Sequence, residues 1–402
     1  MNSQEKPSLW VYLLPVALVV LMVGFISTGV IQGYTNSSSQ EKKKAFAEII
    51  VAKSIYNKAF PHELMRKKTI KDMLPREDKY ASYLSPAEFQ NFLDGLEGEN
   101  FVGIGVLVGK RDDGSFMVKG VFSDGPARDA GVQFGDVFVS VDGVSTDGKD
   151  MEEIIGMIKG KEGEVVNILF ARSGAPKPIN ISIVRKTVKV GIISRLLERD
   201  YGYVGFFQFR KKTVEAVTMA LRSLVKENNR NLKGVVIDLR HNPGGYLHTA
   251  VELVELFVDP DSIVAIVKEK GINRIFVAED KQEWKKTRIV VLVNEGSASA
   301  SELFSASLKD NKRACIMGRT TYGKGSVQGM YSYDDGSVIK ITTGLFFGPL
   351  QKDIQDVGVT PHVELSESND AVVRSVALGN PEIASSLRAL KHMPKACDHV
   401  TP

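Results

Sequence analysis

The sequence has little cysteine and no strong excess of charge of either sign. Cys315 and Cys397 are too few for a disulfide scaffold, and neither shows the CxxC or Cys/His spacing of a zinc site. The 52 Lys and Arg residues nearly balance the 48 Asp and Glu residues, which leaves a net charge of +4 and no basic stripe. Nucleic-acid binding is therefore not expected. The same absences give no reason to expect a metal.

Charge is also missing from the N-terminal region. No charged residue occurs between Lys6 and Glu41, and Leu9–Gln32 is apolar over a length sufficient for the roughly 20 residues that cross a bilayer. We therefore predict that residues 1–40 form a membrane anchor or signal segment, with an uncleaved transmembrane helix preferred. Cleavage stays open, although no clear A-x-A site follows the run. The lysines at 42–44 follow the run, so the positive-inside rule alone would place the region after it in the cytoplasm, which is opposite to an exported orientation.

The composition after this segment is that of a globular protein, and the hydrophobic periodicity divides it. Residues 41–100 are predicted to be mainly helical, and residues 101–186 show short alternating strands around one helix. Residues 187–365 alternate strands with helices, which predicts βαβ units. Residues 366–402 form a C-terminal tail without a motif. The predicted fold class is α/β, mixed α+β.

A candidate nucleophile lies where the apolar strand IVVLVN ends and NEGSASASE begins. Small side chains here open a helix at the edge where α/β sheets bind ligands, and the helix N-terminus offers N–H groups to an oxyanion. Ser297, Ser299 and Ser301 are all candidates. Serine is also a favoured helix cap, so spacing alone does not choose among them.

A serine nucleophile needs a base, and no histidine fits a recognisable triad. His241 in LRHNPGG is the histidine at a strand's carboxyl end. Lysine is the alternative base when burial removes its proton near neutral pH, and Lys324 in YGKGS has glycines on both sides. The run Gly318–Lys324 also fits G-x-x-x-x-G-K, but Gly325 replaces the Ser or Thr that would hold magnesium. A phosphate-binding loop is therefore not predicted.

Several co-linear motifs between about Tyr80 and Pro361 resemble one protein family. They are FVGIGV, GPARDAGVQFGDVFVSVDG, GVVIDLRHNPGG, NEGSASASELFSASLKDNKRA, TTYGKGSVQ and GSVIKITTG. Together they resemble the carboxyl-terminal processing proteases, serine peptidases with a Ser-Lys dyad and a PDZ domain. The resemblance implies that Ser299 is the nucleophile, that Lys324 is its general base, and that Gln328 orients the lysine amine. It implies no cofactor, metal or nucleotide.

The resemblance also implies roles for backbone groups. The N–H of Ala300 and that of Gly244 or Gly245 would form the oxyanion hole, and the choice of glycine stays open. Residues 101–186 would be the PDZ domain, in which the loop residues Val102, Gly103, Ile104 and Gly105 bind a terminal carboxylate. Asp310 matches a supporting acidic position. The chain departs from the family pattern at residues 349–352 and at His362, which leaves substrate preference open.

The expected function is a serine endopeptidase that cleaves protein substrates near their C-termini, with residues 187–365 as the protease core. Expected partners are proteins or peptides with free C-termini and, through the N-terminal helix, a membrane. A homo-oligomer or an adaptor protein remains open. The catalytic region would face the periplasm or another extracytoplasmic space, where Cys315 and Cys397 could pair. The alternative is a catalytically silent PDZ scaffold that only binds peptide ends.

Overall fold

The computed structural model describes most of the chain after residue 38. The described residues are 19–20, 39–97, 100–111, 113–122, 125–133, 135–189, 192–365, 372–373 and 381–400. The fold divides into two compact units. The smaller unit takes residues up to Phe92 together with Lys268–Asn273 and Ser326–Leu345, and the larger unit takes the rest. The domain boundaries given above remain predictions.

The smaller unit packs helix α1 (Ser39–Lys53) against a β-hairpin. Strands β18 (Ser326–Ser332) and β19 (Val338–Phe347) form this hairpin. Phe46 and Ile50 of α1 are fully buried in a cluster with Tyr331. Further elements are α2 (Pro61–Met65), η1 (Lys71–Met73), β2 (Ser82–Leu84) and α3 (Pro86–Glu97).

The predicted membrane-spanning run falls almost entirely outside the described residues. Of this run the structure describes Val19–Val20, a two-residue strand β1 that pairs antiparallel with Met330 and Tyr331 of β18. Among the residues that the structure describes, no helix combines the length and the hydropathy needed to span a bilayer. The anchor thus remains a prediction.

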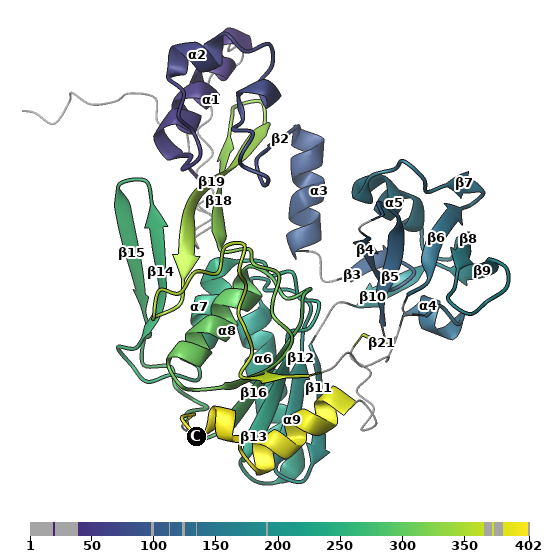
Figure 1. Cartoon of the computed structure of the whole chain (residues 1–402), viewed down its shortest axis with the longest axis vertical. Coiled ribbons are helices and arrows are strands. Elements are labelled where there is room, and N and C mark those ends of the chain that lie inside the picture. Colours follow the sequence, from purple (N-terminus) through teal and green to yellow (C-terminus); the bar gives the residue numbers. More distant parts are fainter. Residues whose placement is uncertain are drawn as a thin grey trace, which may run out of the picture. The chain divides into compact units, whose positions relative to one another are not determined.

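Most strands of residues 100–189 form the small sheet predicted from the alternating pattern (Figure 1), whereas Asn100–Gly103 and Lys186–Lys189 pair in a separate two-stranded sheet. Phe116, Phe138 and Phe170 from three strands pack with Ile154 of the helix. The strands are β3 (Asn100–Gly103), β4 (Val106–Lys110), β5 (Phe116–Phe122), β6 (Val137–Val141), β7 (Val144–Ser145), β8 (Val165–Ala171), β9 (Ile179–Val184) and β10 (Lys186–Lys189). The helices are α4 (Pro126–Asp129) and α5 (Met151–Ile158).

Residues 192–365 are built on a six-stranded sheet in the order β11-β12-β13-β16-β17-β20. Every neighbouring pair from β12 to β20 is parallel, which confirms the predicted βαβ units. The strands read as continuous apolar runs because both faces of a parallel sheet are covered. They are β11 (Ile193–Glu198), β12 (Tyr201–Gly205), β13 (Gly234–Asp238), β16 (Arg288–Val293), β17 (Cys315–Gly318) and β20 (Val363–Glu364).

Helices cover both faces of this sheet. Gly202 contacts Leu224 of α6 (Thr213–Asn228), whereas the next residue, Tyr203, packs in the cluster that contains Leu390 of α9 (Pro381–Lys391). Because successive strand residues point to opposite faces, α6 and α9 lie on opposite sides. Figure 1 shows α9 crossing β13 and β16, which it contacts. Further helices are α7 (Leu247–Glu255) and α8 (Ala300–Asp310). A hairpin that was not predicted is formed by β14 (Ile263–Glu269) and β15 (Ile272–Val277), and β21 (Val372–Val373) pairs parallel with β5.

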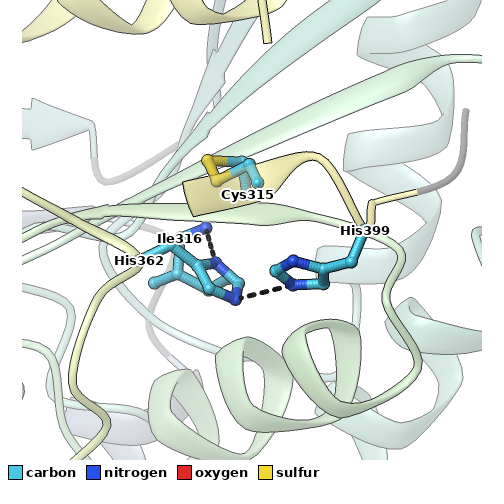
Figure 2. Close-up of a disulfide and its surroundings, with 5 residues drawn as sticks. Cys315, Ile316, His362 and His399 are labelled. Carbon is cyan, nitrogen blue, oxygen red and sulfur yellow. Dashed lines mark hydrogen bonds between the residues drawn. A yellow bond between two sulfur atoms is a disulfide. The ribbon is translucent and has the colours of Figure 1, made fainter. Parts of the chain in front are cut away.

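The cysteines form a disulfide between the sheet and the tail (Figure 2). Cys315 lies in β17 and Cys397 in η2 (Lys395–Cys397), and both are fully buried. Beside them, His362 Nδ1 accepts a hydrogen bond from the Ile316 N–H at 3.0 Å, so neutral His362 carries its proton on Nε2. That nitrogen lies 3.2 Å from Nε2 of His399. Residues 381–400 of the predicted tail thus pack into the core.

Candidate active site

Ser299 stands at the junction between the loop after β16 and helix α8. Its backbone adopts φ 55° and ψ −115°, a sparsely populated conformation for a residue with a side chain. Its carbonyl accepts the N–H groups of Glu302 and Leu303 at 2.9 and 3.0 Å, while its hydroxyl makes no capping hydrogen bond in this part of the described chain. Ser299 is therefore held in a strained turn that leaves its half-buried side chain available for chemistry.

The two neighbouring serines have structural roles. Ser297 Oγ donates to the Leu239 carbonyl at 2.8 Å and accepts the Asn294 N–H at 2.9 Å. Ser301 Oγ donates to the Asn242 carbonyl at 2.8 Å. Both serines are completely buried. The geometry thus separates the three serines that spacing left equivalent.

The buried carboxylate of Glu302 joins the Ser299 turn to the Lys324 loop. Oε2 accepts the backbone N–H groups of Ser299 and Lys324, each at 2.8 Å. Oε1 accepts the Gly323 N–H at 2.7 Å and the Thr321 hydroxyl at 2.6 Å. A buried charge needs such donors, and here they come from both loops. In the sequence, Ser299 and Glu302 form the S-x-x-E pattern of a helix start. This pattern predicts the contact of Glu302 with Ser299 but not its contacts with the Lys324 loop.

Lys324 is half-buried in a loop that packs closely against a neighbouring segment. A Cβ on Gly323 would lie 3.1 Å from the Val357 nitrogen, and one on Gly325 would lie 2.6 Å from the Gln355 nitrogen. Both glycines on the two sides of Lys324 thus allow a close approach that a larger residue would prevent. Gly325 is followed by β18 and not by a helix, in agreement with the rejection of a phosphate-binding loop.

The HNPGG loop after β13 lies against the start of α8. A Cβ on Gly244 would lie 2.6 Å from the Ala298 carbonyl oxygen and 2.8 Å from the Ala300 nitrogen. The Gly244 N–H already donates to Asn242 Oδ1 at 2.9 Å. Gly245 approaches Phe209 instead, where an added Cβ would lie 2.1 Å from the carbonyl oxygen. Gly244, the loop glycine that contacts the start of α8, therefore has its own N–H engaged.

Three other predicted residues occupy defined positions. Gln328 belongs to the smaller unit, where its Nε2 donates to Ser326 Oγ at 2.9 Å, and its role beside the lysine remains a prediction. Asp310 ends α8 and accepts the Leu350 N–H at 3.0 Å, a turn contact, and burial raises the pKa of its carboxyl. His241 Nε2 lies 2.8 Å from the Asn294 side-chain amide and so links two loops.

Sequence reasoning missed a buried ionic group at the end of β13. Asp238 is fully buried and accepts Arg240 Nη2 at 2.7 Å and the Tyr203 hydroxyl at 2.8 Å. Burial opposes the charge of Arg240, but the carboxylates of Asp238 and Glu382 outweigh it and raise the arginine pKa above its ordinary value. This group fixes the start of the loop that leads to the glycines.

One cluster in the described residues meets the spatial requirement for a metal site. Ligand atoms of Cys315, His362 and Cys397 lie within 4.8 Å of one another. Both sulfurs are joined in the disulfide, whereas a metal requires thiolates. In this oxidised form the cluster does not provide a metal-binding set.

The predicted carboxylate-binding loop connects β3 to β4. Val102 and Gly103 end β3, and Ile104 is buried in the hydrophobic core. Gly105 has φ +77° and approaches Gly125 so closely that a Cβ would lie 2.8 Å from its Cα. Among the strands that the structure describes, β4 pairs with β5 alone, so its second edge is unpaired there. An unpaired edge beside such a loop is suited to strand addition.

Comparison with known proteins identifies the family. Residues 200–365 match peptidase family S41, and residues 117–172 match a PDZ domain. The chain is 32% identical over 331 residues to a carboxy-terminal-processing protease of Bartonella bacilliformis, covering 81% of this chain and 76% of that protein. This chain belongs to peptidase family S41. It is a serine-type peptidase of the C-terminal processing kind and carries a PDZ domain.

A second relative and a solved structure agree with this assignment. The S41 chain is 30% identical over 371 residues to the carboxy-terminal processing protease CtpA of Bacillus subtilis, covering 90% of this chain and 78% of that protein. Its fold matches that of a photosystem II D1 C-terminal processing protease with a TM-score of 0.64 and 24% identity, over 90% of this chain and all of that one. The scaffold alternative without catalysis is therefore set aside.

Proposed function

We propose that Ser299 and Lys324 form the catalytic dyad of this peptidase. The neutral Lys324 amine takes the proton of the Ser299 hydroxyl, and Oγ attacks the substrate carbonyl. The peptide C–N bond then breaks, the amine fragment leaves with a proton from the lysine, and water hydrolyses the acyl-enzyme. The observation that carries this proposal is the Glu302 carboxylate, whose Oε2 accepts the backbone N–H groups of both residues.

The oxyanion hole is assigned to the N–H groups of Ala300 and Gly245. Ala300 opens α8, where an N–H group has no partner within the helix. Gly245 is preferred over Gly244, because the Gly244 N–H already donates to Asn242. Two such donors stabilise the negative charge that develops on the carbonyl oxygen in the transition state.

A lysine can act as a base only when its amine is neutral. Lowering a lysine pKa from about 10.4 to about 7 costs on the order of 4 to 5 kcal/mol, so substrate and protein must enclose the amine. Gln328 would orient the amine lone pair toward Ser299 by accepting one of its hydrogens. Lys324 already lies in a close-packed loop between two glycines, which supports this role.

The PDZ domain would bind the free C-terminus of a protein substrate. The substrate would add as a strand to the free edge of β4, and the N–H groups between Val102 and Gly105 would receive its carboxylate. Val106 and Val108 of β4 pack against the same hydrophobic core as Ile154 and Ile158 of α5. Cleavage near C-termini follows from binding of the chain end.

We further propose export of the catalytic region, with the run at residues 9–32 as a membrane anchor. The buried disulfide supports this location, because structural disulfides persist in oxidising compartments. The catalytic domain would then act in the periplasm or an equivalent extracytoplasmic space. A homo-oligomer or an adaptor remains open as a further partner.

Cleavage of an unstructured protein with an apolar C-terminus tests the dyad. Ser299→Ala and Lys324→Ala should each abolish cleavage while leaving the melting temperature close to that of the wild type. Ser307→Ala is the matched control for the serine, because its buried hydroxyl in α8 has no hydrogen-bond partner in the described structure. Lys286→Ala, on an exposed lysine, is the control for the cation. Unchanged proteolysis in either dyad variant would contradict the proposal.

A further inference from the structure

We propose that Glu382, in the C-terminal helix α9, is a positioning residue for the catalytic loops. This inference rests on the proposed role of Ser299. Glu382 lies outside residues 200–365, the segment that matches the peptidase family. The segment that carries it was predicted only as a C-terminal tail without a motif. Its side chain is only 4% exposed and points into the core, where it meets cations from two loops.

One oxygen of Glu382 binds the loop that provides the oxyanion hole. Oε2 forms an ion pair with Nη1 of Arg240, which is 6% exposed. Arg240 also binds the fully buried Asp238 at the end of β13 and leads directly into the HNPGG loop. Without Glu382, Arg240 keeps the Asp238 carboxylate as its counter-charge, but its buried Nη1 loses the charged acceptor that holds it in place. Removal of the Glu382 charge would therefore disturb the start of this loop.

The other oxygen of Glu382 binds an arginine that contacts the loops carrying Ser299 and Lys324. Oε1 accepts Nη1 of Arg319 at 3.0 Å, and Arg319 Nε donates to Glu295 Oε2 at 2.9 Å. Glu295 lies in the loop that ends at Ser299, and Arg319 begins the loop that contains Lys324. Glu382 is thus the shared partner of an arginine on the oxyanion loop and an arginine that contacts both dyad loops.

Helix α9 is attached to the sheet independently of this carboxylate. Ile383 and Leu390 are 1% and 0% exposed and pack with Val236 and Val290 of the central strands. The Leu390 carbonyl accepts Arg288 Nη1 at 3.2 Å. The disulfide at Cys397 adds a covalent attachment. A substitution that removes only the Glu382 charge should therefore leave the helix in place.

The test compares Glu382→Gln with Ile383→Ala. For each variant, kcat and KM are measured on a peptide substrate at a temperature where circular dichroism shows that all variants are folded. Both substitutions should lower the melting temperature, but only Glu382→Gln removes the ion pairs. We expect Glu382→Gln to lower kcat at least tenfold with KM changed less than threefold. Ile383→Ala, and Arg388→Gln on the exposed face of α9, should keep kcat within twofold of the wild type.

Two results would overturn the inference. The first is a wild-type kcat in Glu382→Gln, and the second is an equal loss of kcat in Ile383→Ala, which would indicate a purely structural role. Ser299→Ala is assayed in parallel, so that a failure of the positioning role can be distinguished from a failure of the proposed function. Loss of activity in Ser299→Ala with normal Glu382→Gln refutes the positioning role alone. An active Ser299→Ala refutes the proposed function and the positioning role with it.

Discussion

A single oxygen atom of Glu302 accepts the backbone N–H groups of Ser299 and Lys324, each at 2.8 Å. The two residues are separated in sequence by the whole of α8 and β17, yet one buried carboxylate fixes the backbone of both. In the proposed mechanism this carboxylate does not touch the substrate. It sets the distance between the turn that carries the nucleophile and the loop that carries the base.

Glu302→Gln should therefore damage catalysis more than folding. The amide would present an NH₂ group to donors that now meet an oxygen, at a cost of about 2 kcal/mol, or roughly 30-fold in kcat/KM. Steady-state kinetics on a peptide substrate measures this change. Glu252→Gln on α7, whose partly exposed carboxylate pairs with His248, is the control and should be neutral. Equal kinetics for the two variants would refute the role of Glu302.

Gly244→Ala should reduce both stability and activity. The residue has φ +99°, and the new Cβ would lie 2.6 Å from the Ala298 oxygen and 2.8 Å from Ser299 Cβ, so the backbone must move. We expect a loss of about 1 to 3 kcal/mol in the free energy of unfolding and more than tenfold in kcat. Urea unfolding and kinetics check both values.

Gly156→Ala is the matched control for this substitution. Gly156 lies inside α5, and an added Cβ there meets nothing within 4 Å. Alanine favours helix, so this variant should gain about 0.5 to 1 kcal/mol. If Gly244→Ala proved as well tolerated as Gly156→Ala, the close approach of the HNPGG loop to Ser299 would be wrong.

The disulfide should contribute strongly to stability. It joins residues 82 positions apart, and closing a loop of that length in the unfolded chain is worth about 4.5 kcal/mol in the chain-entropy description. Protein refolded with dithiothreitol should therefore unfold at lower urea than protein refolded without it. Cys315→Ser should be insensitive to the reductant. Identical midpoints with and without dithiothreitol in the wild type would contradict this prediction.

His362 should make stability depend on pH in the mildly acidic range. Burial lowers the pKa of its imidazole to about 4, with Lys309, His399 and Lys352 also disfavouring the charged form. In the unfolded chain the pKa is about 6.5, so the unfolded state binds the proton first and stability falls as the pH drops from about 6.5 to about 4. Because the ring is partly solvated, we expect an effect of roughly 1 to 2 kcal/mol.

Comparison of unfolding free energies at pH 4.5 and pH 7 measures this effect. His362→Gln should show a smaller difference between the two pH values than the wild type. Ser307→Ala, which removes no titrating group, should leave the difference unchanged. An unchanged pH dependence in His362→Gln would show that another group is responsible.

The parts of this molecule that the sequence predicted are those with local signals. The apolar run of β16 followed by small residues predicts a helix start. The co-linear family motifs indicate Ser299 and Lys324 as the dyad. The S-x-x-E pattern at Glu302 predicts a cap, but its contact with the Lys324 loop depends on how α8 packs. Glu382 had no local signal, because its partner Arg240 lies 142 positions away and only folding brings them together.

Intact-protein mass spectrometry after rapid mixing with an activated ester substrate tests the central claim most directly. The account predicts an acyl adduct on the wild type, mapped by digestion to Ser299, that forms faster as pH rises through the lysine pKa. It predicts no adduct on Ser299→Ala and strongly slowed acylation on Lys324→Ala. An adduct on another residue, or wild-type acylation by Lys324→Ala, would contradict the Ser-Lys dyad.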